Sequence, residues 1–167
     1  MYTVSQLVVY GIHGVCKILQ TEEKRVDGQS VNYFVLEPLA QPGSRYYIPS
    51  QNPVALSKIR PLMDKAELLA VLSDQSLKQD WVQQENRRKM VYRQILSSGD
   101  VSMLMGMLRV LQTHKQLQAQ NGRRIHICDE NFERDAEKII KGEVAVVMEL
   151  GDQEALSCLR TYLNGIE

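Results

Sequence analysis

The chain lacks the features that mark membrane and secreted proteins. It has 167 residues, and no apolar run approaches the ~20 residues that a membrane helix needs. Its first residues, MYTVSQLVVYGIHG, contain no basic head and no small-residue cleavage site, so we expect no signal peptide. These absences favour a cytoplasmic protein without a membrane partner.

Cysteine is scarce, and its spacing is not that of a metal site. Cys16, Cys128 and Cys158 lie far apart, and none belongs to a CxxC pair. His114 and His126 have no ligand-like spacing to each other or to a cysteine. The pattern indicates neither a disulfide framework nor a zinc site, and it predicts reduced thiols and no metal.

Catalytic motifs are also missing. The sequence contains no GxSxG, HExxH, P-loop or GxGxxG pattern. His13, between an apolar run and Gly14, has no acidic or cysteine partner nearby, which favours a structural hydrogen bond over catalysis. We therefore expect a protein that is not an enzyme and has no cofactor and no small-molecule substrate.

Charge is balanced over the chain but uneven along it. The formal net charge is zero. Residues 81–125 carry eight lysines and arginines against two acidic residues, a net of +6, and residues 126–167 carry four against ten, a net of −6. A basic segment is what phosphate contact requires, because lysine and arginine displace the counterions condensed on nucleic acid.

The first half of the chain has strand character. Short apolar runs rich in β-branched and aromatic residues occupy 7–10, 15–19, 31–36 and 45–48, and Asp27-Gly28 predicts a tight turn. Such runs predict a small antiparallel barrel of the SH3 or Tudor kind over residues 1–52, with an edge strand open to pairing. Residues 53–63, with Pro53 and Pro61, are predicted as a linker that could include a last short strand.

Residues 64–167 have helical periodicity. Asp64 and Glu67 fit a capping box for a first helix, and Gly99 and Asp100 suit the end of one helix and the cap of the next. A second helix is predicted from 76 to 96, followed by helices from 101, 129 and 152. The sequence thus predicts a two-domain protein, β then α, whose C-terminal domain is all-α with about five helices.

Several short motifs follow one another at a characteristic spacing: Leu7-Val8-Val9-Tyr10, His13-Gly14, Gly28, Tyr33-Phe34-Val35-Leu36, Ile48-Pro49, Asn86-Arg87-Arg88, Tyr92, Ser98-Gly99-Asp100-Val101, Asp129-Glu130, Ala136 and Gly142-Glu143-Val144. In this order they resemble the CarD/CdnL family of bacterial transcription regulators over nearly the whole chain. The resemblance implies that the barrel docks on the β subunit of RNA polymerase, partly by edge-strand pairing. It also implies that the helical domain contacts promoter DNA and favours the open complex.

The family's polymerase contacts map onto four positions of this chain. Lys24 and Val26 precede Gly28 where the family has such contacts. Tyr47 stands where the family often has an arginine, and Arg45 lies two residues earlier on the same face of the predicted strand. The resemblance therefore implies polymerase binding by Lys24, Val26, Arg45 and Tyr47.

The family's DNA contacts map onto the middle of the chain. Arg87 and Arg88 match basic positions that face DNA, Lys89 extends this run, and Arg123 and Arg124 are candidates for a second phosphate contact. Many family members place a tryptophan wedge where Glu85 stands here, whereas Trp81 lies four residues earlier, one turn away on the same face of the predicted helix.

Two functions from different classes remain open at this point. The first is a transcription regulator, nucleoid-associated through polymerase, that binds both the polymerase β subunit and promoter DNA. The alternative is a protein–protein interaction module without DNA binding, which the zero net charge and the displaced tryptophan favour. The sequence leaves open whether the protein activates or represses, which promoters respond, and its oligomeric state.

Overall fold

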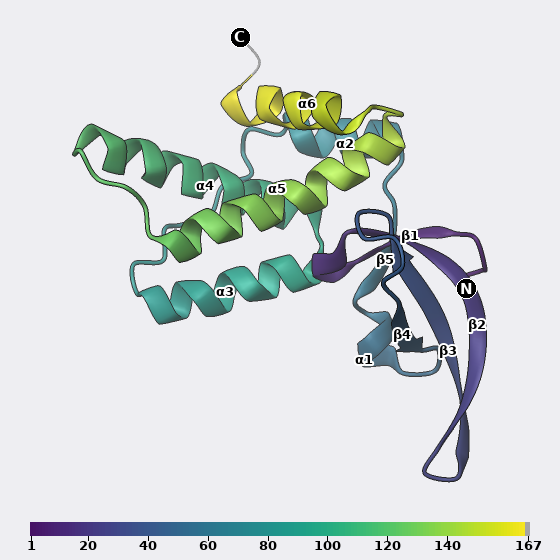
Figure 1. Ribbon diagram of the computed structural model, residues 1–167. Coiled ribbons are helices and arrows are strands. Elements are labelled where there is room, and N and C mark those ends of the chain that lie inside the picture. The colour runs from purple at the N-terminus through teal and green to yellow at the C-terminus, as the bar shows by residue number, and fades with distance from the viewer. Residues whose placement is uncertain (166–167) are drawn as a thin grey trace.

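The computed structural model describes residues 1–165 and has a β-sheet followed by a helical domain (Figure 1). The sheet is antiparallel, with strand order β4-β3-β2-β1-β5. Its strands are β1 Leu7–Tyr10, β2 Val15–Val26, β3 Gln29–Pro38, β4 Tyr46–Pro49 and β5 Ile59–Pro61, and a short 3-10 helix, η1, covers Gly11–His13. The predicted order, β then α, is confirmed.

Local sequence explains the sheet's shape. Asp27 and Gly28 both have positive φ, 49° and 80°, which is the two-residue hairpin geometry expected of Asp-Gly. The β2–β3 hairpin that they close projects away from the helices (Figure 1). Alternate apolar side chains pack on one face of the sheet to form its core: Val8, Cys16, Ile18, Phe34, Leu36, Ile48 and Ile59.

The segment predicted as a linker is part of the folded sheet region. Residues 53–63 contain the helix α1, Pro53–Leu56, and the strand β5. Asn52 caps α1 by accepting the N–H groups of Val54 and Ala55, and β5 pairs antiparallel with β1. The chain therefore passes from the sheet to the next helix within a few residues.

The helical domain consists of α2 Lys65–Ser73, α3 Glu85–Ser98, α4 Val101–Gln120, α5 Ile127–Val147 and α6 Asp152–Asn164. Asp64 and Glu67 form the predicted capping box. Gly99 ends α3 with φ of 63°, and Asp100 caps α4 by accepting the N–H of Met103 at 3.0 Å. Within the described residues, no helix has the length and apolar character needed to span a membrane.

The predicted helix from 76 to 96 is wrong in its first half, because α3 begins only at Glu85. Two buried arginines bind the backbone carbonyls of the preceding segment. Arg109 donates to the carbonyls of Leu72, Asp74 and Leu77, and Arg88 donates to those of Val82 and Gln83. These carbonyl oxygens accept hydrogen bonds from arginine side chains and not from the backbone N–H groups of a helix. The segment therefore forms an irregular loop in place of a helical turn.

The two domains meet at a junction centred on Arg60 of β5. Its guanidinium donates to both carboxylate oxygens of Glu143 at 2.9 and 2.5 Å and to the carbonyl of Gly99 at 3.0 and 2.7 Å. Glu143 is 0% exposed and also accepts the N–H of Met63 at 2.9 Å. Nearby, a Cβ on Gly11 would lie 2.6 Å from the Ser97 carbonyl oxygen, so the sheet and α3 approach at a position that only glycine fits.

Candidate functional site

One candidate surface lies on β4, one of the two edge strands of the sheet. Among the described strands, β4 pairs only with β3. Tyr47 is 39% exposed, the ammonium of Lys24 lies 3.6 Å from the centre of its ring, and the Tyr33 ring packs against it edge-on at 6.4 Å. Lys24, Tyr33 and Tyr47, from β2, β3 and β4, form what we call the β4 patch.

The other two predicted polymerase contacts flank this patch. Val26 is 44% exposed at the end of β2, two residues beyond Lys24, and Arg45 is exposed directly before β4. Lys24 also lies 3.6 Å from Glu22. An exposed cation–π contact contributes about 0.5–1 kcal/mol and a surface ion pair about as much or less. The β4 patch is therefore preformed, yet a binding partner could rearrange it at small cost.

At the other end of the molecule, Arg88 is a structural residue. It is 5% exposed, and its guanidinium donates two hydrogen bonds of 2.9 Å to the carboxylate of Asp129, which is 1% exposed. These hydrogen bonds raise the pKa of Arg88. The predicted contact of Arg88 with DNA would therefore require breaking a buried ion pair that joins α3 to α5 before a phosphate could reach the guanidinium.

Trp81 lies in the loop before α3 and not on a helix, so it is not one helical turn from Glu85. Its ring stacks on His114 at 3.7 Å with an interplanar angle of 15°, and the Arg88 guanidinium lies 4.4 Å from the ring centre. The indole N–H donates to the side-chain oxygen of Gln83 at 3.1 Å. The ring is half-buried against the helical core, so a wedge role would require it to leave His114.

The remaining predicted DNA contacts are on the surface. Arg87, Arg123 and Arg124 are exposed, whereas Lys89 is half-buried and forms an ion pair with Glu85. Glu85 at the start of α3 lies beside His126 and Cys128 at the start of α5, so Arg87 and Arg124 come from neighbouring segments. These two helix starts lie at the end of the helical domain away from the sheet (Figure 1). We call Arg87, Arg123 and Arg124 the basic end.

Ion pairs and burial reduce the positive charge that residues 81–125 expose to solvent. Arg88 is neutralised by Asp129, Lys89 by Glu85, and Lys115 by Glu133 at 2.9 Å. Arg109 is buried and donates to backbone carbonyls, and its burial lowers its pKa. Four of the eight basic residues, Arg87, Arg93, Arg123 and Arg124, are exposed and form no ion pair among residues 1–165. Arg93 lies farther along α3, and the other three are the basic end.

Sequence reasoning missed two groups of residues. Arg60 had no local signal, and Glu143 stood out only within the Gly142-Glu143-Val144 motif. His126 and Cys128, which showed no ligand-like spacing in sequence, lie with Nδ1 and Sγ 3.0 Å apart. Arg60 and Glu143 are distant in sequence, and His126 meets Cys128 because it caps the start of α5. Both pairings are therefore seen only in the three-dimensional structure.

Comparison with known proteins finds a similarity in the N-terminal part of the chain. The family model of the CarD-like/TRCF RID domain matches residues 2–62. This range begins before β1 and ends after β5, so it contains the whole sheet, the β4 patch and Arg60. No curated protein matches the chain.

Proposed function

We propose that the protein is a bacterial transcription regulator that bridges RNA polymerase and promoter DNA, because the family model of the CarD-like/TRCF RID domain matches residues 2–62. The sheet binds the β subunit of the polymerase, and the basic end contacts the DNA backbone. Holding both partners together modulates the stability of the open complex. The protein is then nucleoid-associated through the polymerase.

The observation that carries this proposal is the family match over the complete sheet. The RID is a non-enzymatic interaction domain, and the match supports a transcription-related role through RNA polymerase binding. Within residues 1–165, one side of β4 pairs with no strand and offers backbone groups for strand addition, in which main-chain hydrogen bonds supply affinity and neighbouring side chains supply specificity. The β4 patch with Val26 and Arg45 would supply that specificity.

The DNA arm of the proposal depends on exposed charge. Arg87, Arg123 and Arg124 can reach phosphates without breaking an ion pair among residues 1–165. Phosphate contacts position a protein on a duplex without reading its sequence. The junction at Arg60 and Glu143 holds the sheet on the helical domain, so the site of polymerase binding would determine where the basic end meets the promoter.

Polymerase binding can be tested by pull-down of the purified β subunit with the full chain. Tyr47→Ala and Lys24→Glu together should reduce recovery strongly, because they remove the aromatic platform and invert the charge beside it. Lys65→Glu, an exposed charge reversal on α2, is the matched control and should leave recovery unchanged. Equal recovery with all three proteins would argue against the β4 patch as the contact.

DNA binding can be tested by affinity against salt, again with the full chain. Replacing Arg87, Arg123 and Arg124 with Gln should flatten the slope of log affinity against log salt by about 0.9 for each phosphate that these arginines neutralise in the wild-type complex. The control replaces three other exposed basic residues, Lys17, Lys58 and Lys65, with Gln. If both triple variants behave alike, the basic end is not the DNA surface.

The second candidate function is an interaction module that binds polymerase but not DNA. The internal pairing of Arg88, Lys89 and Lys115 favours it, since it leaves few free cations for phosphate. A wild-type protein whose affinity for DNA is absent at low salt, while its recovery of the β subunit is intact, would support this alternative.

A further inference from the structure

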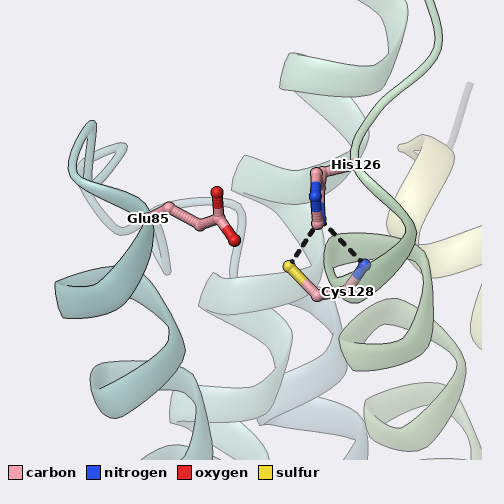
Figure 2. A group of neighbouring side chains, drawn as sticks. All are labelled: Glu85, His126 and Cys128. Carbon is pink, nitrogen blue, oxygen red and sulfur yellow. Dashed lines mark hydrogen bonds between the residues drawn. The ribbon is translucent and has the colours of Figure 1, made fainter.

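Three potential metal ligands meet where α3 and α5 begin. Glu85 is the first residue of α3, His126 is the N-cap of α5, and Cys128 lies in its first turn. One ligand atom from each residue lies within 4.8 Å of the other two, and His126 Nδ1 is 3.0 Å from Cys128 Sγ. Figure 2 shows the carboxylate of Glu85 directed toward the imidazole and the thiol from the facing helix.

We propose that Glu85, His126 and Cys128 bind a divalent transition-metal ion of the zinc type. Sulfur, imidazole nitrogen and carboxylate oxygen are the three donor types that Zn²⁺ takes in proteins. Around a tetrahedral ion at the usual bond lengths of 2.0–2.3 Å, two ligand atoms lie roughly 3.5 Å apart. The observed separations need only small side-chain adjustments to reach this geometry, and water would complete the fourth position.

Some neighbouring groups favour metal binding at this cluster, and others disfavour it. Two helix starts face the cluster, and their N–H groups favour the deprotonated thiol and carboxylate, whose two negative charges match a divalent cation. Lys89 now pairs with Glu85, so the ion must displace this ammonium. The Nδ1 atom also accepts the backbone N–H of Cys128 at 3.2 Å, and metal binding at Nδ1 would cost this capping hydrogen bond.

Cys128 binds a metal ion as a thiolate, so metal binding would release a proton from its thiol. Together these costs predict a site of moderate affinity rather than a permanently loaded structural zinc. When bound, the ion would join the start of α3 to the start of α5, beside the Arg88–Asp129 pair that already links them. It would thereby order the segments that carry Arg87 and Arg124.

The test is a cobalt titration of the reduced full chain, followed by zinc competition. Co²⁺ bound by Cys128 should give the near-ultraviolet charge-transfer absorption of a thiolate ligand, with one ion per chain, and Zn²⁺ should abolish it. Cys128→Ser should remove this absorption. Cys158→Ser, which changes a half-buried thiol on α6, is the matched control and should retain it.

Two further variants test the other ligands without touching a thiol. Glu85→Gln should weaken binding about tenfold or more, since loss of even an outer-shell partner costs 10–100-fold in metal sites. Lys89→Met removes the competing ammonium and should strengthen binding. Circular dichroism should show that each variant keeps its helices.

The proposal is overturned if wild-type protein gives no thiolate absorption. It is equally overturned if Cys158→Ser removes the absorption, or if Glu85→Gln and Lys89→Met leave the affinity unchanged. Because none of these readouts involves polymerase or DNA, the result is independent of the proposed function.

Discussion

Two arginine–carboxylate pairs fix this molecule at opposite ends of one helix. At the junction, Arg60 of β5 binds Glu143, and at the other end Arg88 of α3 binds Asp129. Both carboxylates belong to α5 and are essentially unexposed. The arginines differ, because the Arg60 side chain is 21% exposed and joins two domains, whereas that of Arg88 is 7% exposed and joins two helices of one domain.

Helix α5 is therefore the element that connects the sheet to the basic end. Asp129 and Glu143 are fourteen positions apart on this helix, which corresponds to about 21 Å at 1.5 Å per residue. The pair at Asp129 holds the start of α3, and the pair at Glu143 holds the sheet. Breaking the first should unfold part of a domain, and breaking the second should change how two domains are oriented.

The largest effect is expected from Asp129→Ala. This change leaves the Arg88 guanidinium buried without its carboxylate, and breaking one partner of a buried pair costs about 3–5 kcal/mol. Chemical denaturation should show this loss in the free energy of unfolding. The double variant Arg88→Met with Asp129→Leu should recover much of it, because no unpaired charge remains. An Asp129→Ala protein as stable as wild type would mean that the Arg88 guanidinium reaches water by another path.

A smaller loss is expected from Glu143→Ala, about 2–3 kcal/mol, because Arg60 keeps the Gly99 carbonyl and part of its exposure. The more specific consequence is in shape. The distribution of distances between a fluorophore on the sheet and a fluorophore on α4 should become broader, while circular dichroism stays near that of the wild type. In Asp129→Ala, the same distribution of distances across the junction should broaden less than in Glu143→Ala. A larger broadening in Asp129→Ala would contradict the roles assigned to the two pairs.

Gly11→Ala tests the close approach of the sheet to α3. At φ of +44° a side chain is strained, and its Cβ would lie 2.6 Å from the Ser97 carbonyl oxygen, so we expect a loss of about 2–3 kcal/mol in unfolding free energy. Gly122→Ala is the control, because it has φ of +68° and no atom within 4 Å of the added Cβ. That variant should cost only the conformational strain of about 1–2 kcal/mol. Equal losses would show that Ser97 moves aside freely.

Sequence reasoning succeeded where the cause of structure is local. The Asp27-Gly28 turn, the Asp64–Glu67 capping box and the Gly99-Asp100 boundary all depend on residues within a few positions of one another. It failed over 76–84, where Arg88 and Arg109 bind the backbone carbonyls.

The candidate site was less predictable than the fold for the same reason. The +6 count over 81–125 treated every cation as free, but Asp129 lies 41 positions from Arg88 along the chain. On the sheet, by contrast, strand register alone brings Lys24 toward Tyr47, because alternate residues of adjacent strands share a face. Residues that share a β face can be grouped from sequence, whereas long-range ion pairs between helices cannot.

The smallest effect concerns the stack of Trp81 on His114, which lies beside Arg88. Burial lowers the pKa of His114 below the usual value of about 6.5, so the folded state favours the neutral ring. Stability from this group is fully present above the unfolded pKa and is lost as pH falls through the lower folded pKa. Fluorescence of Trp81, the single tryptophan, should therefore change with pH with a midpoint below pH 6.5. His114→Gln should abolish the change, while His13→Gln keeps it.

Adding melted promoter DNA separates two outcomes for the Trp81 ring. A retained pH response means that the ring stays on His114, and an abolished response means that it has moved into the DNA as a wedge.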